Sequence, residues 1–135
     1  MPFHGPAHVI AHVLRKIGVD PHERISEFCQ DPEYTACRAE EVPLYFELYL
    51  ATSDPAERDL LCCFLLEGLN DFCAAGQPHH FQSRILDALF AAESAHTEEL
   101  AYWMDTSDRD PDNRWPISAY LIEHRQPVDE RIDKT

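Results

Sequence analysis

Apolar residues recur along this chain at spacings of three and four positions, and no segment sustains an alternation of apolar and polar residues. The first spacing places apolar side chains on one face of an α-helix, whereas alternation would indicate a β-strand. The expected helices cover residues 6–18, 20–30, 40–52, 54–76, 79–104 and 115–123. The pattern leaves open whether residues 79–104 form one helix or two. The sequence therefore predicts an all-α fold of six or seven short helices.

The stretch from Asp54 to Gly76 predicts a central helix over residues 55–75. Asp54 is a suitable N-cap, Pro55 fits the first helical position, and Glu57 stands where a capping box has its second acidic residue. A glycine is a common helix terminator, so Gly76 marks the expected end. Apolar residues cover most of the circumference of this helix, so we expect it to contact several neighbours.

The whole chain of 135 residues is about one domain long, and its 44% hydrophobic content is enough for a core. Short helices, antiparallel neighbours and prolines at helix starts favour an irregular bundle or a HEAT-like arrangement around the central helix. We expect a single domain over residues 1–135, in which the charged residues 126–135 fray.

The charge is strongly unbalanced, because 25 acidic residues face 11 basic ones and give a formal net charge of −14. Such a surface repels phosphate groups, so we expect no binding to nucleic acid or to an anionic membrane. A basic protein is its natural electrostatic partner.

The expected location is the cytoplasm. Five cysteines form no CxxC pair and are odd in number, which favours free thiols in a reducing compartment. No stretch has the length and apolar content of a signal peptide or a transmembrane helix.

One segment combines negative charge with large aromatic residues, and we take it as the candidate partner-binding surface. Interface hot spots are often aromatic, and acidic fields accelerate association with basic partners. The predicted binding residues are Tyr102, Asp105, Asp108, Asp110, Asp112 and Trp115.

Catalytic signatures are missing from the sequence. It has neither a GxSxG nucleophile motif nor a glycine-rich phosphate loop. We therefore expect no enzyme, no catalytic residue, no cofactor and no metal.

Two other functions stay open as alternatives. A small helical metalloprotein would use His8 with His12, four residues apart on a helix, or the ExxH pair of Glu93 and His96. A homo-oligomeric structural or adaptor protein would associate through an aromatic patch around Tyr45 and Tyr49.

The segments ERDLLCCFLLEGLNDF, EELAYWMD and RWPISAYL belong to a small, acidic, helical chain without a catalytic motif. In this general character the protein resembles the helical immunity proteins of bacterial toxin systems. That resemblance implies a cytosolic inhibitor, similar to an antitoxin, which binds a cognate toxin and covers its active site or blocks its assembly. It implies no role for any individual residue.

Overall fold

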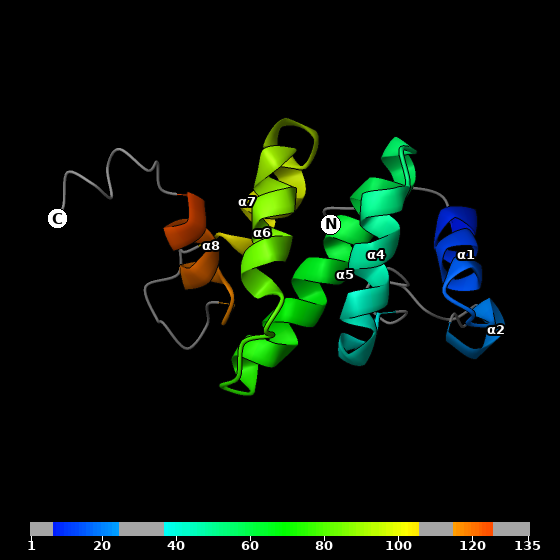
Figure 1. Cartoon of the computed structure of the whole chain (residues 1–135), viewed down its shortest axis with the longest axis horizontal. Helices are drawn as coiled ribbons and strands as arrows, with labels where there is room; N and C mark the ends of the chain where they lie inside the picture. Colours follow the sequence, from blue (N-terminus) through cyan, green and yellow to red (C-terminus); the bar gives the residue numbers. More distant parts are fainter. Residues whose placement is uncertain (1–6, 25–36, 106–114, 126–135) are drawn as a thin grey trace, which may run out of the picture.

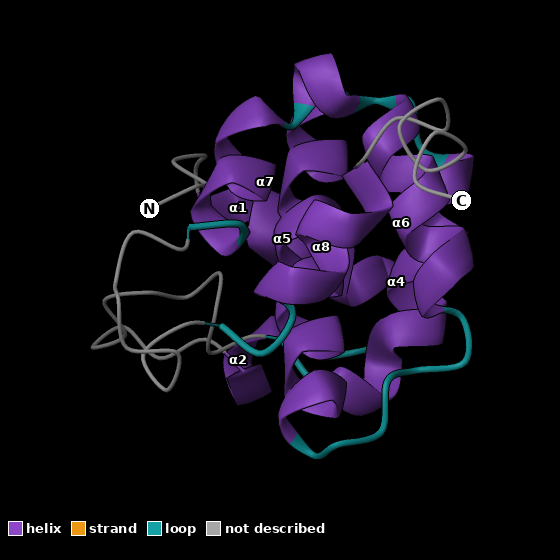
Figure 2. Ribbon diagram, turned by 90° about the vertical axis from the view of Figure 1, so that its left-hand side faces the viewer, coloured by secondary structure: helices purple, strands orange, loops and turns teal. Residues whose placement is uncertain are grey.

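The computed structural model describes residues 7–24, 37–105 and 115–125, and these residues contain helices and loops but no strand (Figure 2). The all-α prediction is therefore confirmed. The α-helices are α1 (Ala7–Lys16), α2 (Pro21–Arg24), α4 (Val42–Ala51), α5 (Pro55–Ala74), α6 (Gln82–Ala91), α7 (Thr97–Trp103) and α8 (Ser118–Arg125). Two 3₁₀ turns, η1 (Ala39–Glu41) and η2 (Glu93–Ala95), precede α4 and α7.

The long helix α5 lies at the centre of the molecule, as the sequence predicts (Figure 1). It contacts α1, α4, α6 and α7, and ten of its 20 residues are buried. The helices follow one another along the long axis, with α1 and α2 at one end and α8 at the other (Figure 1). The apolar circumference of α5 explains this arrangement, because each side of the helix needs a neighbour to exclude water.

Both ends of α5 use local hydrogen bonds. The Asp54 side chain accepts a bond from the Ala56 N–H (3.3 Å), and Pro55 is the first helical residue. At the other end Gly76 adopts a φ of 78°, and the Gln77 N–H donates to the Phe72 carbonyl (3.1 Å). This is a Schellman motif, in which a glycine tolerates the left-handed conformation that closes the helix.

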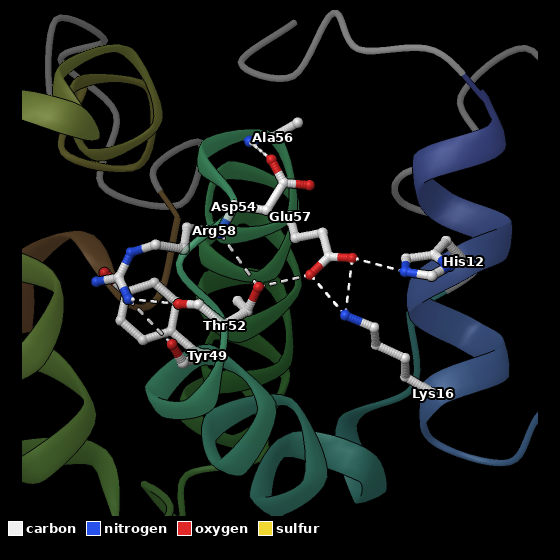
Figure 3. Close-up of polar contacts among 8 residues, drawn as sticks. All are labelled: His12, Lys16, Tyr49, Thr52, Asp54, Ala56, Glu57 and Arg58. Carbon is white, nitrogen blue, oxygen red and sulfur yellow. Dashed lines mark hydrogen bonds and ion pairs between the residues drawn. The ribbon is translucent and has the colours of Figure 1, made fainter.

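The predicted capping box is wrong. Glu57 is 3% exposed and turns toward α1, where the Lys16 ammonium lies 2.9 Å from both carboxylate oxygens (Figure 3). The Thr52 hydroxyl donates to Glu57 (2.6 Å), and the His12 ring nitrogen lies 3.0 Å from it. The Asp54 N–H, which a capping box would satisfy through Glu57, donates instead to Thr52 (3.3 Å). Glu57 therefore joins α1 to the start of α5.

Gly68 of α5 lies directly against Val42 at the start of α4. A β-carbon built on Gly68 would lie 2.4 Å from a methyl carbon of Val42, far inside van der Waals contact. Helix axes approach closely only where the facing residues are small. Gly68 therefore sets the spacing of the two helices.

The helix boundaries settle one question that the sequence left open and correct the start of the last helix. Residues 79–104 form two helices, α6 and α7, with the turn η2 between them. The last helix begins at Ser118, three residues after Trp115. Of the helix expected over residues 20–30, the described part is α2, whereas residues 25–36 and the tail 126–135 lie outside the described residues.

The predicted exposed aromatic patch around Tyr45 and Tyr49 is also wrong, because the two side chains are 0% and 1% exposed. The Tyr45 hydroxyl accepts a bond from the Arg38 N–H (2.9 Å) and donates to Glu41 (2.7 Å). Helical spacing identifies the apolar face of α4, but it does not show whether another helix buries that face. In the structure α5 packs against α4.

Candidate functional site

The described members of the predicted partner-binding set are Tyr102, which lies in α7, and Asp105 and Trp115, which lie in the chain between α7 and α8. Tyr102 is half-buried and Trp115 is 39% exposed, with ring centroids 5.7 Å apart. Trp103 is buried beneath them, 5.0 Å from the Trp115 ring. Asp105 follows α7 and is exposed. Asp108, Asp110 and Asp112 lie outside the described residues. We call the six predicted residues the aromatic–acidic surface.

Hydrogen bonds to neighbouring helices hold the turn that carries Trp115. The Ile117 N–H donates to the Asn70 side chain of α5 (3.1 Å), and the Ser118 hydroxyl donates to the Trp103 carbonyl. Ile117 and Ser118 are both buried. The Trp115 ring itself packs on Tyr102 and Trp103, which restricts the side chain, so it loses less conformational entropy on binding.

A second group of polar side chains lies inside the molecule, between α4, α5 and α7. Its centre is His96, which is 0% exposed and precedes the first residue of α7. One ring nitrogen, Nδ1, lies 3.0 Å from Asp59 Oδ1, and the other, Nε2, lies 2.8 Å from the Tyr49 hydroxyl. Together with Glu99 of α7, these residues form what we call the His96 cluster: Tyr49, Asp59, His96 and Glu99.

The electrostatics of the cluster favour a neutral imidazole. Burial lowers the pKa of His96, and nearby Arg58 lowers it further, although Asp59 acts in the opposite direction. The Asp59 carboxylate only accepts hydrogen bonds, so the Nδ1–H of the neutral ring donates to it, and Nε2 accepts from the Tyr49 hydroxyl. Arg58 lies 4.1 Å from the Tyr49 ring centroid and donates to the Tyr49 and Thr52 carbonyls (Figure 3).

Glu99 is the least compensated charge of the cluster. It is 5% exposed, and among the described residues no lysine or arginine forms an ion pair with it. Burial, together with the negative charges of Asp59 and Glu98, raises the pKa of Glu99 to about 7. A carboxylate in this position is stabilised by any cation that reaches it.

Of the two metal-ligand pairs considered from the sequence, Glu93 and His96 each have another partner in the structure, and the pair of His8 and His12 is only partly described. Glu93 lies in η2 and forms an ion pair with Arg125 of α8 (2.9 Å), while His96 faces Asp59. His12 contacts Glu57, and the side chain of His8 lies outside the described part of the chain.

Sequence reasoning missed Asp59 and Glu99. The position of Glu99 three residues after His96 could have indicated the pair, because residues three apart on a helix are neighbours on its surface. Asp59 carried a weaker signal, as a single acidic residue directly before the most apolar part of α5. Because α5 and α7 are distant in sequence, only the tertiary contact joins the two helices.

No family model, no curated protein and no solved structure matches the chain. Among the described residues, no helix combines the length and apolar character needed to cross a membrane.

Proposed function

We propose that this protein is a cytoplasmic inhibitor that binds a basic protein partner, in the manner of an immunity protein neutralising a bacterial toxin. The observation that carries the proposal is the joint presence of a net charge of −14 and an exposed aromatic side chain, Trp115, held in place beside Tyr102. The negative charge resembles that of a nucleic-acid substrate and suits a basic cleft.

The two parts of the aromatic–acidic surface have different roles in this proposal. The aspartates accelerate the encounter with a basic surface, an effect that weakens as salt screens the charges. Tyr102 and Trp115 supply the apolar area that slows dissociation, since a few aromatic residues commonly carry most of the binding energy.

The test uses the purified full chain and the purified product of the adjacent gene. We expect a complex whose association rate falls as NaCl is raised, and inhibition of the partner's activity at equimolar concentration. Trp115→Ala should weaken binding about 10-fold, equivalent to a loss of about 1.4 kcal/mol. Asparagine at positions 105, 108, 110 and 112 should slow association and change dissociation little.

Tyr120→Ala is the matched control, because Tyr120 is an exposed aromatic residue of α8 that belongs to no ring contact with Trp115. This variant should bind like the wild type. If the neighbouring gene product does not bind, or if binding is insensitive to both salt and Trp115→Ala, the proposal is wrong.

A further inference from the structure

The His96 cluster brings three metal-ligating side chains together from two different helices. Asp59 comes from α5, and His96 and Glu99 come from the start of α7. One ligand atom from each of the three lies within 4.8 Å of the other two. We propose that Asp59, His96 and Glu99 bind a divalent transition-metal ion, with Zn²⁺ as the best-suited ion.

The donor set selects the metal class. One imidazole nitrogen and two carboxylate oxygens suit Zn²⁺ and its first-row neighbours, whereas Mg²⁺ and Ca²⁺ prefer sites made of oxygen alone. Three protein ligands also leave a coordination position for water or for a group of a partner. This is the open type of site, in contrast to the closed four-ligand sites that serve structure alone.

The geometry requires only small movements. Metal–ligand bonds of about 2.0–2.2 Å place neighbouring ligand atoms about 3–4 Å apart. His96 Nδ1 and Asp59 Oδ1 are already 3.0 Å apart, and a Glu99 ligand atom lies within 4.8 Å of a ligand atom of each of the other two residues. The Asp59 side chain is 37% exposed, so an ion reaches the cluster past this residue.

The surroundings of His96 match those of a metal-bound histidine. A ligating imidazole usually donates its second N–H to a neighbouring acceptor, which fixes the ring orientation. Here the Tyr49 hydroxyl lies 2.8 Å from Nε2, and Arg58 holds Tyr49 through its ring and its carbonyl. On binding, the ring stays neutral and changes tautomer: Nδ1 gives up one proton and becomes available to the metal, and Nε2 takes up one proton. The Tyr49 hydroxyl then rotates so that its oxygen accepts from Nε2–H.

Charge also favours a cation at this place. Two carboxylates approach one another in a largely buried environment, and the nearby Arg58 directs its guanidinium at the Tyr49 and Thr52 carbonyls. A divalent ion between Asp59 and Glu99 removes their mutual repulsion. The site is independent of the proposed inhibitory function, because none of its ligands belongs to the aromatic–acidic surface.

The test is calorimetric titration of the tag-free full chain, freed of metal by a chelator, with ZnCl₂ and separately with MgCl₂. We expect Zn²⁺ to bind at the cluster and Mg²⁺ not to bind. Asp59→Asn and Glu99→Gln keep the side-chain shape and remove one ligand charge each. Each should weaken this Zn²⁺ binding by about 100-fold or more, and Tyr49→Phe, which removes only the hydrogen-bond partner of His96, by about 10-fold.

Glu98→Gln and Glu93→Gln are the matched controls, since each removes one negative charge within three residues of His96 without removing a ligand. Both should bind Zn²⁺ like the wild type. Circular dichroism in chelator checks that every variant is folded. If Asp59→Asn or Glu99→Gln fails to fold, NMR of the wild-type histidine rings decides, because Zn²⁺ should shift the Nδ1 resonance of His96.

Three results would overturn the proposal: no Zn²⁺ binding by the wild type, unchanged binding by a folded protein that carries both Asp59→Asn and Glu99→Gln, or ring shifts confined to other histidines. The last two would assign the metal to another site. None of them bears on partner binding, which is measured without added metal.

Discussion

Glu57 is a single residue whose neighbours in space, and not in sequence, decide what it does. Its spacing after Asp54 is that of a capping residue, yet its carboxylate pairs with Lys16, which lies 41 positions away. Burial alone would raise the pKa of Glu57, but the hydrogen bonds from Thr52 and Lys16 more than offset it and leave the pKa below its ordinary value.

Replacing Glu57 tests this network. Glu57→Gln keeps the size of the side chain but leaves the Lys16 ammonium without its counter-charge, so we expect a loss of about 1–3 kcal/mol in the free energy of unfolding at pH 7. Urea denaturation of the variant and the wild type measures this difference in the free energy of unfolding. Glu47→Gln, on the exposed side of α4, should change stability by less than about 0.5 kcal/mol.

The effect of Glu57→Gln on stability should also depend on pH. Because the folded-state pKa of Glu57 is depressed, the ionised carboxylate contributes its full stability above the ordinary pKa of 4.5 and loses it as the pH falls through the folded-state value. The stability difference between wild type and Glu57→Gln should therefore shrink as the pH is lowered below 4.5. A difference that grows in acid would show that another interaction dominates.

At the scale of helices, α5 is the element that the sequence describes best. Asp54, Pro55 and Gly76 mark its ends through local backbone chemistry, which needs no other part of the chain. The division of residues 79–104 into α6 and α7 was less clear, since no proline or glycine stands at the break. There the buried contacts of His96 favour a turn over a continuous helix.

Gly68→Ala tests the packing of α4 on α5. Alanine is the better helix former by about 1 kcal/mol, but the new methyl group would clash with Val42, and overpacking costs about 1–3 kcal/mol. We therefore expect net destabilisation in urea or thermal unfolding.

Combining Gly68→Ala with Val42→Ala separates the clash from other effects. The double variant should be more stable than the sum of the two single effects predicts, because truncating Val42 makes room for the new methyl group. Additive effects would mean that the two side chains do not limit the approach of α4 to α5.

For the molecule as a whole, the net charge of −14 makes a prediction that does not involve a partner. Like charges repel one another in the compact state, and salt screens this repulsion. The urea midpoint of the chelator-treated protein should therefore rise between 20 mM and 500 mM NaCl, with little change in the m-value. An equal rise in KCl shows that ionic strength is responsible, whereas a falling midpoint would mean that attractive surface pairs prevail.

The candidate sites were predictable to different degrees. Composition alone shows the excess of negative charge, and Tyr102 and Trp115 are neighbours because both flank one short segment of the chain. The His96 cluster was not predictable, since its carboxylates come from α5 and α7 and no local pattern links Asp59 to Glu99. Glu93, which the alternative of a metalloprotein paired with His96, lies in a 3₁₀ turn before α7 and forms an ion pair with Arg125.

The sequence by itself determined the helical class, the central helix and its ends, and the negative charge, because periodicity, capping and composition are local or additive properties. The tertiary structure decided which faces are buried and which distant side chains meet. In the folded chain Tyr45 and Tyr49 are buried, Glu57 contacts Lys16 of α1, and Asp59 lies beside His96. These outcomes depend on how helices dock on one another, and docking is a property of two surfaces that neither segment encodes alone.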